Sequence, residues 1–215
     1  MGTISLKEFT SSKCYPLAMQ TYSVDPMTIK EKYGRWGKYI HTHIFANKAS
    51  EKRGFKTNAK NKASGMIGQL AVHQLNVSLG IPMDSNKQIC LVDYDENDGK
   101  ILINNGIPIQ TKTKNFYKIF SPDCSVMIPV DQYKKYDKNS IIFGCAFLPD
   151  LNMVSIIGYI SFIEFDKKKV LKKEGDKLRD GFTVSGPPSY MIYYSDLHNS
   201  QREYSEFINN GGSNQ

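Results

Sequence analysis

Residues 98–114 read DGKILINNGIPIQTKTK, two short apolar runs joined by turn residues. Asn104, Asn105 and Gly106 form the turn in this interpretation, because Asn and Gly accept the backbone angles that tight hairpins require. With the turn centred there, positions whose numbers add to about 210 face each other across the hairpin. The stretch therefore predicts two antiparallel strands and the register between them.

This register brings polar side chains together at one end of the hairpin. Lys112 falls opposite Asp98, and Gln110 falls opposite Lys100. Gln110 and Lys112 are two residues apart, so both point to the same face of their strand. A carboxylate and a side-chain carbonyl oxygen suit a hard cation such as Mg²⁺, while a neighbouring ammonium can orient a water and neutralise charge on a phosphate. The hairpin is thus a candidate site for phosphodiester chemistry.

The chain on either side of the hairpin predicts a mixture of helices and strands. Ser64 is a suitable N-cap, and apolar residues at three- and four-residue spacing up to Leu79 predict a helix that stops at Gly80. β-branched and aromatic runs predict further strands. The predicted strands are residues 88–93, 100–104, 107–114, 140–148, 153–165 and 190–194, and a short helix is predicted over residues 129–136.

The composition is that of a globular protein with an excess of positive charge. The 215 residues are 40% hydrophobic and carry a formal net charge of +7, which allows a full core and favours anionic partners. No apolar run approaches the roughly 20 residues of a membrane-spanning helix. The first residues also lack the charged-then-apolar order of a signal peptide. We therefore expect a cytoplasmic protein without a membrane partner.

Two Lys-rich segments flank the hairpin. Residues 48–62 read KASEKRGFKTNAKNK and predict a basic loop or arm, while residues 167–179 predict a charged stretch, such as a solvated helix face. Each segment is either a phosphate-contacting surface or an ordinary solvated one. The candidate nucleic-acid contacts are Lys52, Arg53, Lys56, Lys60, Lys62 and Lys114.

The hairpin motif and the order of the predicted elements resemble the PD-(D/E)xK nuclease superfamily. Its core is described by a helix, three strands, a helix and a strand, and its signature is an Asp followed by Glu/Asp-x-Lys. The resemblance covers residues 64–148 as a core. Residues 156–182 (IIGYISFIEFDKKKVLKKEGDKLRDGF) and 190–197 (YMIYYSDL) also look like the end of uncharacterised phage and bacterial members.

This resemblance implies an α/β fold with a restriction-endonuclease-like core, in which helices flank a mixed central sheet. The nuclease core would occupy residues 63–165. Residues 1–62 would be an N-terminal basic extension, and residues 166–215 a C-terminal extension with a disordered tail.

The resemblance also implies roles for the residues of the hairpin. Asp98 would be the metal carboxylate, Lys112 the lysine beside the attacking water, and the main-chain carbonyl of Thr111 a further metal ligand. Gln110 stands where most members have Glu or Asp, and a neutral amide is a weaker ligand for Mg²⁺ than a carboxylate. Some homing and restriction nucleases of the superfamily carry Gln at this position, so the catalytic interpretation remains.

The choice of carboxylate has alternatives. Asp93 and Asp95 are the other candidates, because DYDEND at residues 93–98 offers several acids just before the hairpin. Asp98 is preferred because it begins the strand that pairs with Gln110 and Lys112.

Two further elements resemble parts of the superfamily. Gln69, on the polar side of the first predicted helix, is similar to the helix Glu or Gln that assists the metal-bound water in some members; the alternative, which we prefer, is an ordinary surface Gln. Gln132 and Tyr136 are similar to a Gln-x-x-x-Tyr element that follows the active site in exonuclease-like members.

The sequence thus predicts a nuclease that depends on Mg²⁺, or on Mn²⁺ as a substitute, and acts on DNA. The alternative is a catalytically inactive nuclease-fold module that binds nucleic acid or a partner protein, because Gln110 replaces the usual carboxylate. A third interpretation is an interaction protein without a nucleic-acid role. The likeness to phage members implies action inside a bacterial host. The sequence leaves open DNA against RNA, endo- against exonuclease, and the oligomeric state, a homo-oligomer included.

Overall fold

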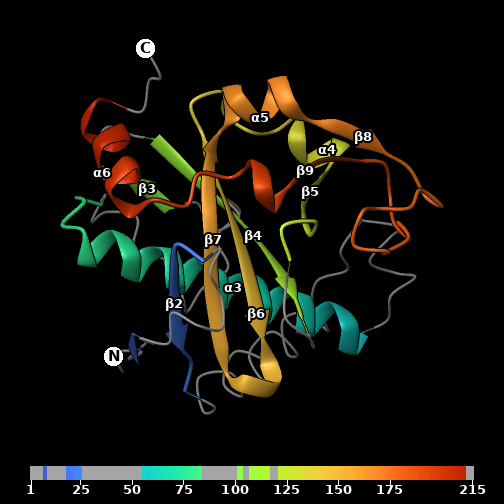
Figure 1. Ribbon diagram of the computed structural model, residues 1–215, viewed down its shortest axis with the longest axis horizontal. Helices are drawn as coiled ribbons and strands as arrows, with labels where there is room; N and C mark the ends of the chain where they lie inside the picture. The colour runs from blue at the N-terminus through green and yellow to red at the C-terminus, as the bar shows by residue number, and fades with distance from the viewer. Residues whose placement is uncertain are drawn as a thin grey trace.

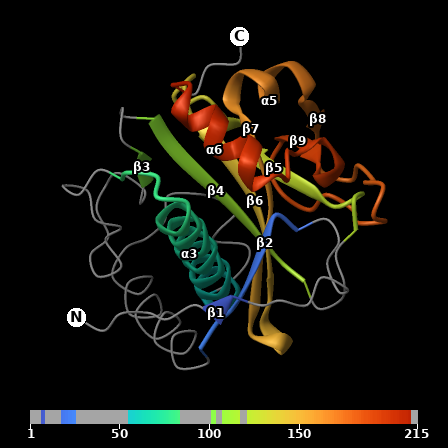
Figure 2. The same cartoon turned by 60° about the vertical axis from the view of Figure 1, so that its left-hand side comes forward.

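The computed structural model describes residues 7–8, 18–25, 55–83, 101–103, 107–116 and 121–211, and of these it describes the backbone alone for 7–8, 55–62 and 101–103. The described chain forms a six-stranded mixed sheet, a second sheet of three strands, and helices (Figures 1 and 2). The α/β class predicted from the sequence is confirmed at this level.

The main sheet has the strand order β1-β2-β7-β6-β4-β3. Its strands are β1 (Lys7–Glu8), β2 (Gln20–Ser23), β3 (Ile101–Ile103), β4 (Ile107–Asn115), β6 (Ile141–Leu148) and β7 (Met153–Ser161). β4 and β6 run parallel, and the other neighbouring strands pair antiparallel. The sheet is therefore mixed, as predicted.

β3 and β4 form the hairpin predicted from residues 98–114. Ile101 pairs with Ile109 and Ile103 pairs with Ile107, so the paired numbers add to 210 as predicted. Turn residues 104–106 and residues 98–100 lie outside the described residues. The opposition of Asp98 and Lys112 therefore stays a prediction.

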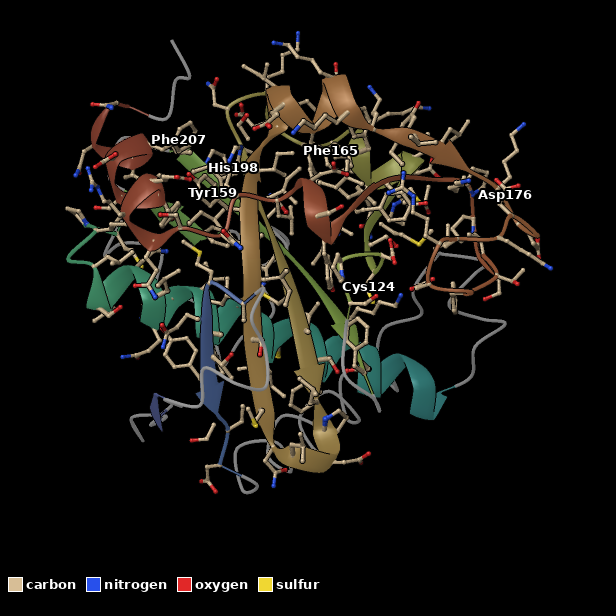
Figure 3. The ribbon with its side chains drawn as sticks, in the orientation of Figure 1. Cys124, Tyr159, Phe165, Asp176, His198 and Phe207 are labelled. Atoms are coloured by element: carbon tan, nitrogen blue, oxygen red, sulfur yellow. The ribbon has the colours of Figure 1, made fainter. Side chains whose placement is uncertain are left out.

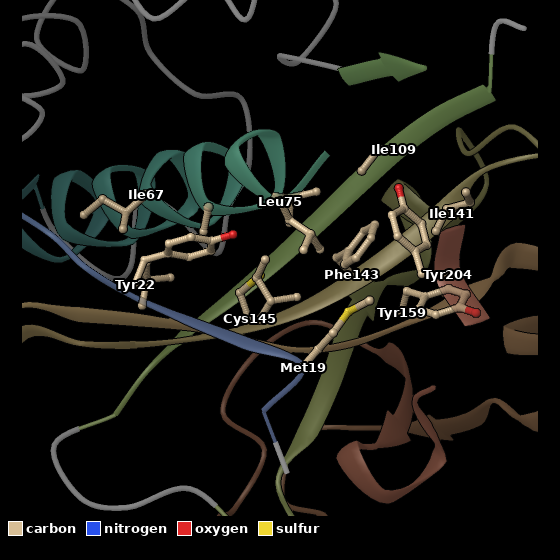
Figure 4. Packing of buried hydrophobic residues seen from close by; sticks show 14 of the residues in the cluster. Met19, Tyr22, Ile67, Leu75, Ile109, Ile141, Phe143, Cys145, Tyr159 and Tyr204 are labelled. Atoms are coloured by element: carbon tan, nitrogen blue, oxygen red, sulfur yellow. The ribbon is translucent and has the colours of Figure 1, made fainter. Parts of the chain in front are cut away.

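One face of the main sheet is covered by α3 (Phe55–Ser78) and α6 (Gln201–Asn209). β6 sends Phe143 and Cys145 to this face, where they join a core that includes Ile67 and Leu75 of α3 and Tyr204 of α6 (Figure 4). Residues of a strand point alternately to its two faces, so the residues between them point to the opposite face.

The opposite face is covered by the second sheet, whose strand order is β5-β9-β8. Its strands are β5 (Ser125–Pro129), β8 (Val170–Lys172) and β9 (Ser189–Tyr193), accompanied by α4 (Val130–Tyr133), α5 (Phe162–Lys168) and the short 3-10 helices η2 (Pro149–Leu151) and η3 (Tyr194–Asp196). Ile142 and Ala146 of β6 pack here against Val126 and Ile192. β6 is consequently buried along its whole length, as strands covered on both faces are.

α3 begins at Phe55, earlier than the predicted start at Ser64. Ser64 is 1% exposed and lies inside the helix, so its prediction as the N-cap was wrong. The residues before it are rich in Lys and Ala, which are strong helix formers even where their charge suggests a loop. The backbone of Lys56, Lys60 and Lys62 therefore belongs to a helix and not to the predicted loop or arm.

β7 ends at Ser161, whereas the apolar pattern predicted a strand up to Phe165. The hydroxyl of Ser161 accepts a hydrogen bond from the backbone N–H of Glu164, which caps α5 and turns the chain into a helix. The basic stretch at residues 167–179 is correspondingly not one helix face. It spans the end of α5, then β8 and a turn.

The described parts of the predicted extensions contribute to the same core. β2 pairs with β7, and Tyr204 and Ile208 of α6 are buried against the face that α3 covers. The last four residues of the predicted tail lie outside the described residues.

Among the helices that the structure describes, none has the length and apolar composition needed to cross a membrane.

Candidate functional site

The candidate site lies on β4, whose two faces contact different layers. Thr111 and Thr113 face α3: a Cβ on Gly68 would lie 3.2 Å from Cγ2 of Thr111 and 2.0 Å from Oγ1 of Thr113. The alternate residues Gln110, Lys112 and Lys114 therefore point to the opposite face. These three polar side chains are half-buried beside the layer that contains α4 and the second sheet.

Lys112 is held by the two residues of the Gln-x-x-x-Tyr element. Its Nζ donates a hydrogen bond of 2.7 Å to Oε1 of Gln132 and lies 5.5 Å from the ring centroid of Tyr136. Gln132 belongs to α4 and Tyr136 to the turn that follows, where the sequence had predicted a longer helix. The ammonium of Lys112 is thus oriented by an amide oxygen and an aromatic ring.

α4 has only four residues, so its position depends on tertiary contacts. Tyr133 stacks on Phe162 at 5.0 Å between ring centroids and meets Tyr190 edge-on at 4.8 Å. The hydroxyl of Tyr133 also donates a hydrogen bond to the carboxylate of Asp166, which accepts another from Lys169. These contacts tie α4 to α5 and β9, and they fix the amide that Lys112 binds.

The contacts between Tyr133, Asp166 and Lys169 shift the pKa values of Asp166 and Tyr133. The hydrogen bonds from Lys169 and Tyr133 hold the pKa of Asp166 below its ordinary value. Burial, followed by the hydrogen bond to Asp166, raises the pKa of Tyr133. At neutral pH the neutral phenol of Tyr133 and the cation of Lys169 therefore both donate to the ionised carboxylate of Asp166, and this arrangement suits a structural role.

Lys114 has a different environment from Lys112. Its Nζ lies 3.1 Å from Oδ2 of Asp180, and the two side chains are 32% and 12% exposed, respectively. The Nζ also lies 5.4 Å from the ring centroid of Phe116 and 5.1 Å from that of Phe182. Lys114, predicted to contact nucleic acid, therefore has its charge compensated by a carboxylate of the segment between β8 and β9.

The structure does not bring every predicted site residue to the face of Lys112. Gln69 lies on α3, which covers the other face of the main sheet. The side chain of Thr111 also points toward α3, which leaves only its main-chain carbonyl as a candidate ligand.

The predicted carboxylates lie outside the part of the chain that the structure describes. This holds for Asp93, Asp95 and Asp98, and also for Lys52 and Arg53. Within the described ranges, no three His, Cys, Asp or Glu side chains are grouped so that they could hold a metal ion. The oxygen atoms of Gln110 and of the Thr111 main chain are the predicted ligands that these ranges include.

Sequence reasoning missed a second polar cluster, which joins α5 to the segment before α6. Nε2 of His198 lies 2.7 Å from Oε2 of Glu164, and Lys168 pairs with the same carboxylate at 2.8 Å. Burial raises the pKa of Glu164, but the hydrogen bonds from Lys168 and His198 outweigh it, so the pKa lies below its ordinary value. The backbone of His198 also pairs with that of Tyr159 in β7 (Figure 3).

The contact between His198 and Glu164 could not be predicted from sequence spacing, because 34 residues separate the two. Its geometry depends on Gly158, where a Cβ would lie 2.3 Å from the main-chain oxygen of His198. The cluster therefore fastens the segment before α6 onto the main sheet.

Comparisons with protein-family models, with curated proteins and with solved structures found no match for this chain. The function proposed below accordingly rests on the residues and geometry of this protein.

Proposed function

We propose that this protein is a Mg²⁺-dependent nuclease that hydrolyses phosphodiester bonds in DNA. Asp98, the side-chain oxygen of Gln110 and the main-chain carbonyl of Thr111 hold the metal ion in this proposal. Lys112 is the residue beside the attacking water.

The environment of Lys112 is the observation that carries the proposal. The hydrogen bond from Nζ to Gln132 and the ring of Tyr136 fix an ammonium on the face of β4 that also carries Gln110. A lysine that served only solubility would need neither contact. An oriented cation beside an oxygen ligand is what phosphodiester hydrolysis requires, because negative charge develops on the phosphate during the reaction.

In this proposal Lys112 and Gln132 act on the water and the phosphate or support that action. Lys112 orients the water and stabilises the negative charge that develops on the phosphate oxygens. Gln132 holds Lys112 in position through the hydrogen bond that Nζ donates to its Oε1. Mg²⁺, when bound, would polarise the phosphate through oxygen ligands of the kind that Gln110 offers.

The architecture is compatible with this proposal. α3 precedes the hairpin, α4 follows it, and β6 then enters the sheet beside β4 in parallel. Of the helix, three strands, helix and strand of the PD-(D/E)xK core, the described residues include α3, β3, β4, α4 and β6. The first predicted strand, residues 88–93, lies outside the described residues, and β5 of the second sheet lies between β4 and α4.

The second candidate function is a module with the same fold that binds nucleic acid without cutting it. The neutral side chain of Gln110, in place of a carboxylate, favours this alternative because it lowers the negative charge available for Mg²⁺. Lys112 would then bind a phosphate as a positioned cation.

Cleavage assays with metal controls test the proposal. The purified protein is incubated with plasmid, linear duplex, single-stranded DNA and RNA in Mg²⁺, Mn²⁺ or EDTA. We expect cleavage of DNA in Mg²⁺ that EDTA abolishes. Asp98→Asn should remove most of this cleavage because it weakens the metal site, while Asp95→Asn, its control in the same acidic stretch, should not.

Gln110→Glu separates the two candidates. It restores the stronger ligand and should preserve or raise cleavage in Mg²⁺. If wild type and Gln110→Glu are both inactive on all substrates but bind DNA, the binding module is the better interpretation. Asp98→Asn that cuts as fast as wild type would refute the assignment of the carboxylate.

A further inference from the structure

The segment between β8 and β9 forms a hairpin that contacts Lys114 of β4 through Asp180. Lys177 and Thr183 pair across it, and the N–H of Leu178 donates a 2.8 Å hydrogen bond to the carbonyl of Phe182. Leu178 and Val184 are buried together with Met191 of β9. The hairpin is therefore anchored by its own small core, and it holds its tip in a defined position.

Phe182 lies at this tip and is 45% exposed. The Nζ of Lys114 lies over its ring at 5.1 Å. Asp180 fixes the arrangement, because Oδ2 pairs with Lys114 while Oδ1 accepts a hydrogen bond from the N–H of Phe182 at 3.0 Å. The ring is thus supported by a cation and remains open to solvent.

The acidic and basic side chains of the hairpin differ in their contacts within the protein. Asp176 and Asp180 are both engaged in contacts within the protein, with the N–H of Lys173 and with Lys114. The cations Lys173, Lys177 and Arg179 are exposed, as is one carboxylate, Glu174, and the guanidinium of Arg179 lies 4.0 Å from the ring centroid of Tyr193. The hairpin that carries Phe182 therefore presents an excess of exposed cations together with aromatic rings, which is the combination that binds single-stranded nucleic acid.

We propose that Phe182 is a base-stacking residue, and that the ligand of this site is a single-stranded nucleic acid. The inference rests on the proposed function, whose substrate class it narrows. Lys114 follows Lys112 by two residues along β4, a separation of about 6.6 Å. A strand that places a phosphate at Lys112 can therefore stack a neighbouring base on Phe182. An unpaired base is required, because the bases inside a duplex are already stacked on both sides.

Lys114 has an anchoring role in this arrangement. Its charge is compensated by Asp180, so it supports the ring of Phe182 and does not serve as a main phosphate contact. The phosphates would be contacted instead by Lys112 and by the exposed cations of the hairpin. Phe182 should consequently contribute to affinity without contributing to its salt dependence.

Binding assays without metal test this inference separately from cleavage. Fluorescence anisotropy is measured in EDTA with a labelled oligo-dT of about 15 nucleotides and with a blunt duplex of equal length. We expect Phe182→Ala and Phe182→Leu to weaken binding of oligo-dT about 5- to 100-fold, since each removes the aromatic face. The duplex should be bound with unchanged affinity, and the salt dependence should also be unchanged. Phe182→Trp should bind oligo-dT at least as tightly as wild type.

Leu171→Ala is the matched control, because Leu171 is an apolar residue of β8, the strand that precedes the hairpin, and is 44% exposed. It should leave both affinities unchanged. If Phe182→Leu binds oligo-dT like wild type, or loses affinity for the single strand and the duplex equally, the stacking inference is wrong while the nuclease proposal stands. Wild type that binds neither ligand at low salt would overturn both.

Discussion

β4 and β6 are parallel neighbours in the main sheet, yet their side chains are buried very differently. All residues of β6 are buried, whereas β4 is buried only from Ile107 to Ile109 and half-buried from Gln110 to Asn115. β6 lies between β4 and β7 and is covered on both faces by apolar clusters. The second half of β4 instead carries amide, hydroxyl and ammonium groups.

Within one sheet, β6 thus carries the apolar core and the second half of β4 carries polar side chains. Residues of β6 contribute apolar area removed from water, the main favourable term in folding. Gln110, Lys112 and Lys114 contribute little apolar area, but they stand on a backbone that β6 holds rigidly. Rigid support of polar side chains is what a catalytic or binding site needs.

The largest effect on stability should come from the buried strand. Phe143 of β6 is completely buried and contacts the rings of Tyr204 and Tyr159, with centroids 5.1 and 6.0 Å away. Phe143→Ala should lower the free energy of unfolding by about 3–5 kcal/mol, because it leaves a cavity in the core. Urea unfolding followed by circular dichroism measures the change. Lys112→Ala in the neighbouring strand should cost less than about 1 kcal/mol, and equal losses would contradict the comparison.

Lys112→Ala should instead affect cleavage. Removal of an oriented charge-stabilising group typically costs about 100- to 1000-fold in rate, and we expect a loss of this size in initial rate with Mg²⁺. Lys135→Ala serves as the control, since Lys135 is an exposed lysine in the turn after α4. A Lys112→Ala protein that cuts at the wild-type rate, or a Lys135→Ala protein that fails equally, would count against the role of Lys112.

The difference between the strands also explains what could be predicted from sequence. The register of β3 and β4 follows from local turn chemistry, and β6 follows from a dense run of β-branched and aromatic residues. The end of β7 was misjudged because Phe162 and Phe165 continue the apolar pattern. The signal that overrides it is the Ser161-x-x-Glu164 capping sequence.

Two other features were not predicted, one despite a local signal and one because its residues are far apart in the sequence. α6 was missed although Ser200 and Glu203 form the same kind of capping signal, and Tyr204 and Ile208 are buried one turn apart. Asp180 lies 66 residues from Lys114, so their pairing depends on how the second sheet packs against β4. The shared face of Gln110 and Lys112 could therefore be predicted from the hairpin, whereas the pairing of Lys114 with Asp180 could not, because the two residues come from distant segments.

A smaller effect is expected on the face of β4 that contacts α3. A Cβ on Gly68 would lie 2.0 Å from Oγ1 of Thr113, so the helix could not keep its present distance from the strand. Gly68→Ala should destabilise the protein by about 1–3 kcal/mol, measured by urea unfolding. Gly65→Ala in the same helix should stabilise it by about 0.5–1 kcal/mol, because no atom lies within 4 Å of the added Cβ. The same sign for both variants would show that contact with β4 does not decide the outcome.

The smallest effect should come from Glu164, a polar residue that stabilises the fold outside the candidate site. Its pKa in the folded protein lies below the ordinary value of 4.5, because hydrogen bonds from Lys168 and His198 outweigh the effect of burial. The resulting stability is present above pH 4.5 and is lost as the pH falls through the folded-state pKa. Glu164→Gln should therefore cost about 0.5–1 kcal/mol at pH 6, a difference from wild type that shrinks toward acidic pH.

Urea unfolding of both proteins between pH 6 and pH 3.5 measures this difference. Arg202→Gln is a suitable control, since Arg202 pairs with Glu206 on the surface of α6 and is 87% exposed. It should change stability by less than Glu164→Gln at pH 6, because such exposed pairs contribute little. Cleavage by Glu164→Gln should match that of wild type, since Glu164 contacts His198 and Lys168 and not the face of β4. A loss of cleavage without a loss of stability would instead extend the functional region beyond β4 and its neighbours.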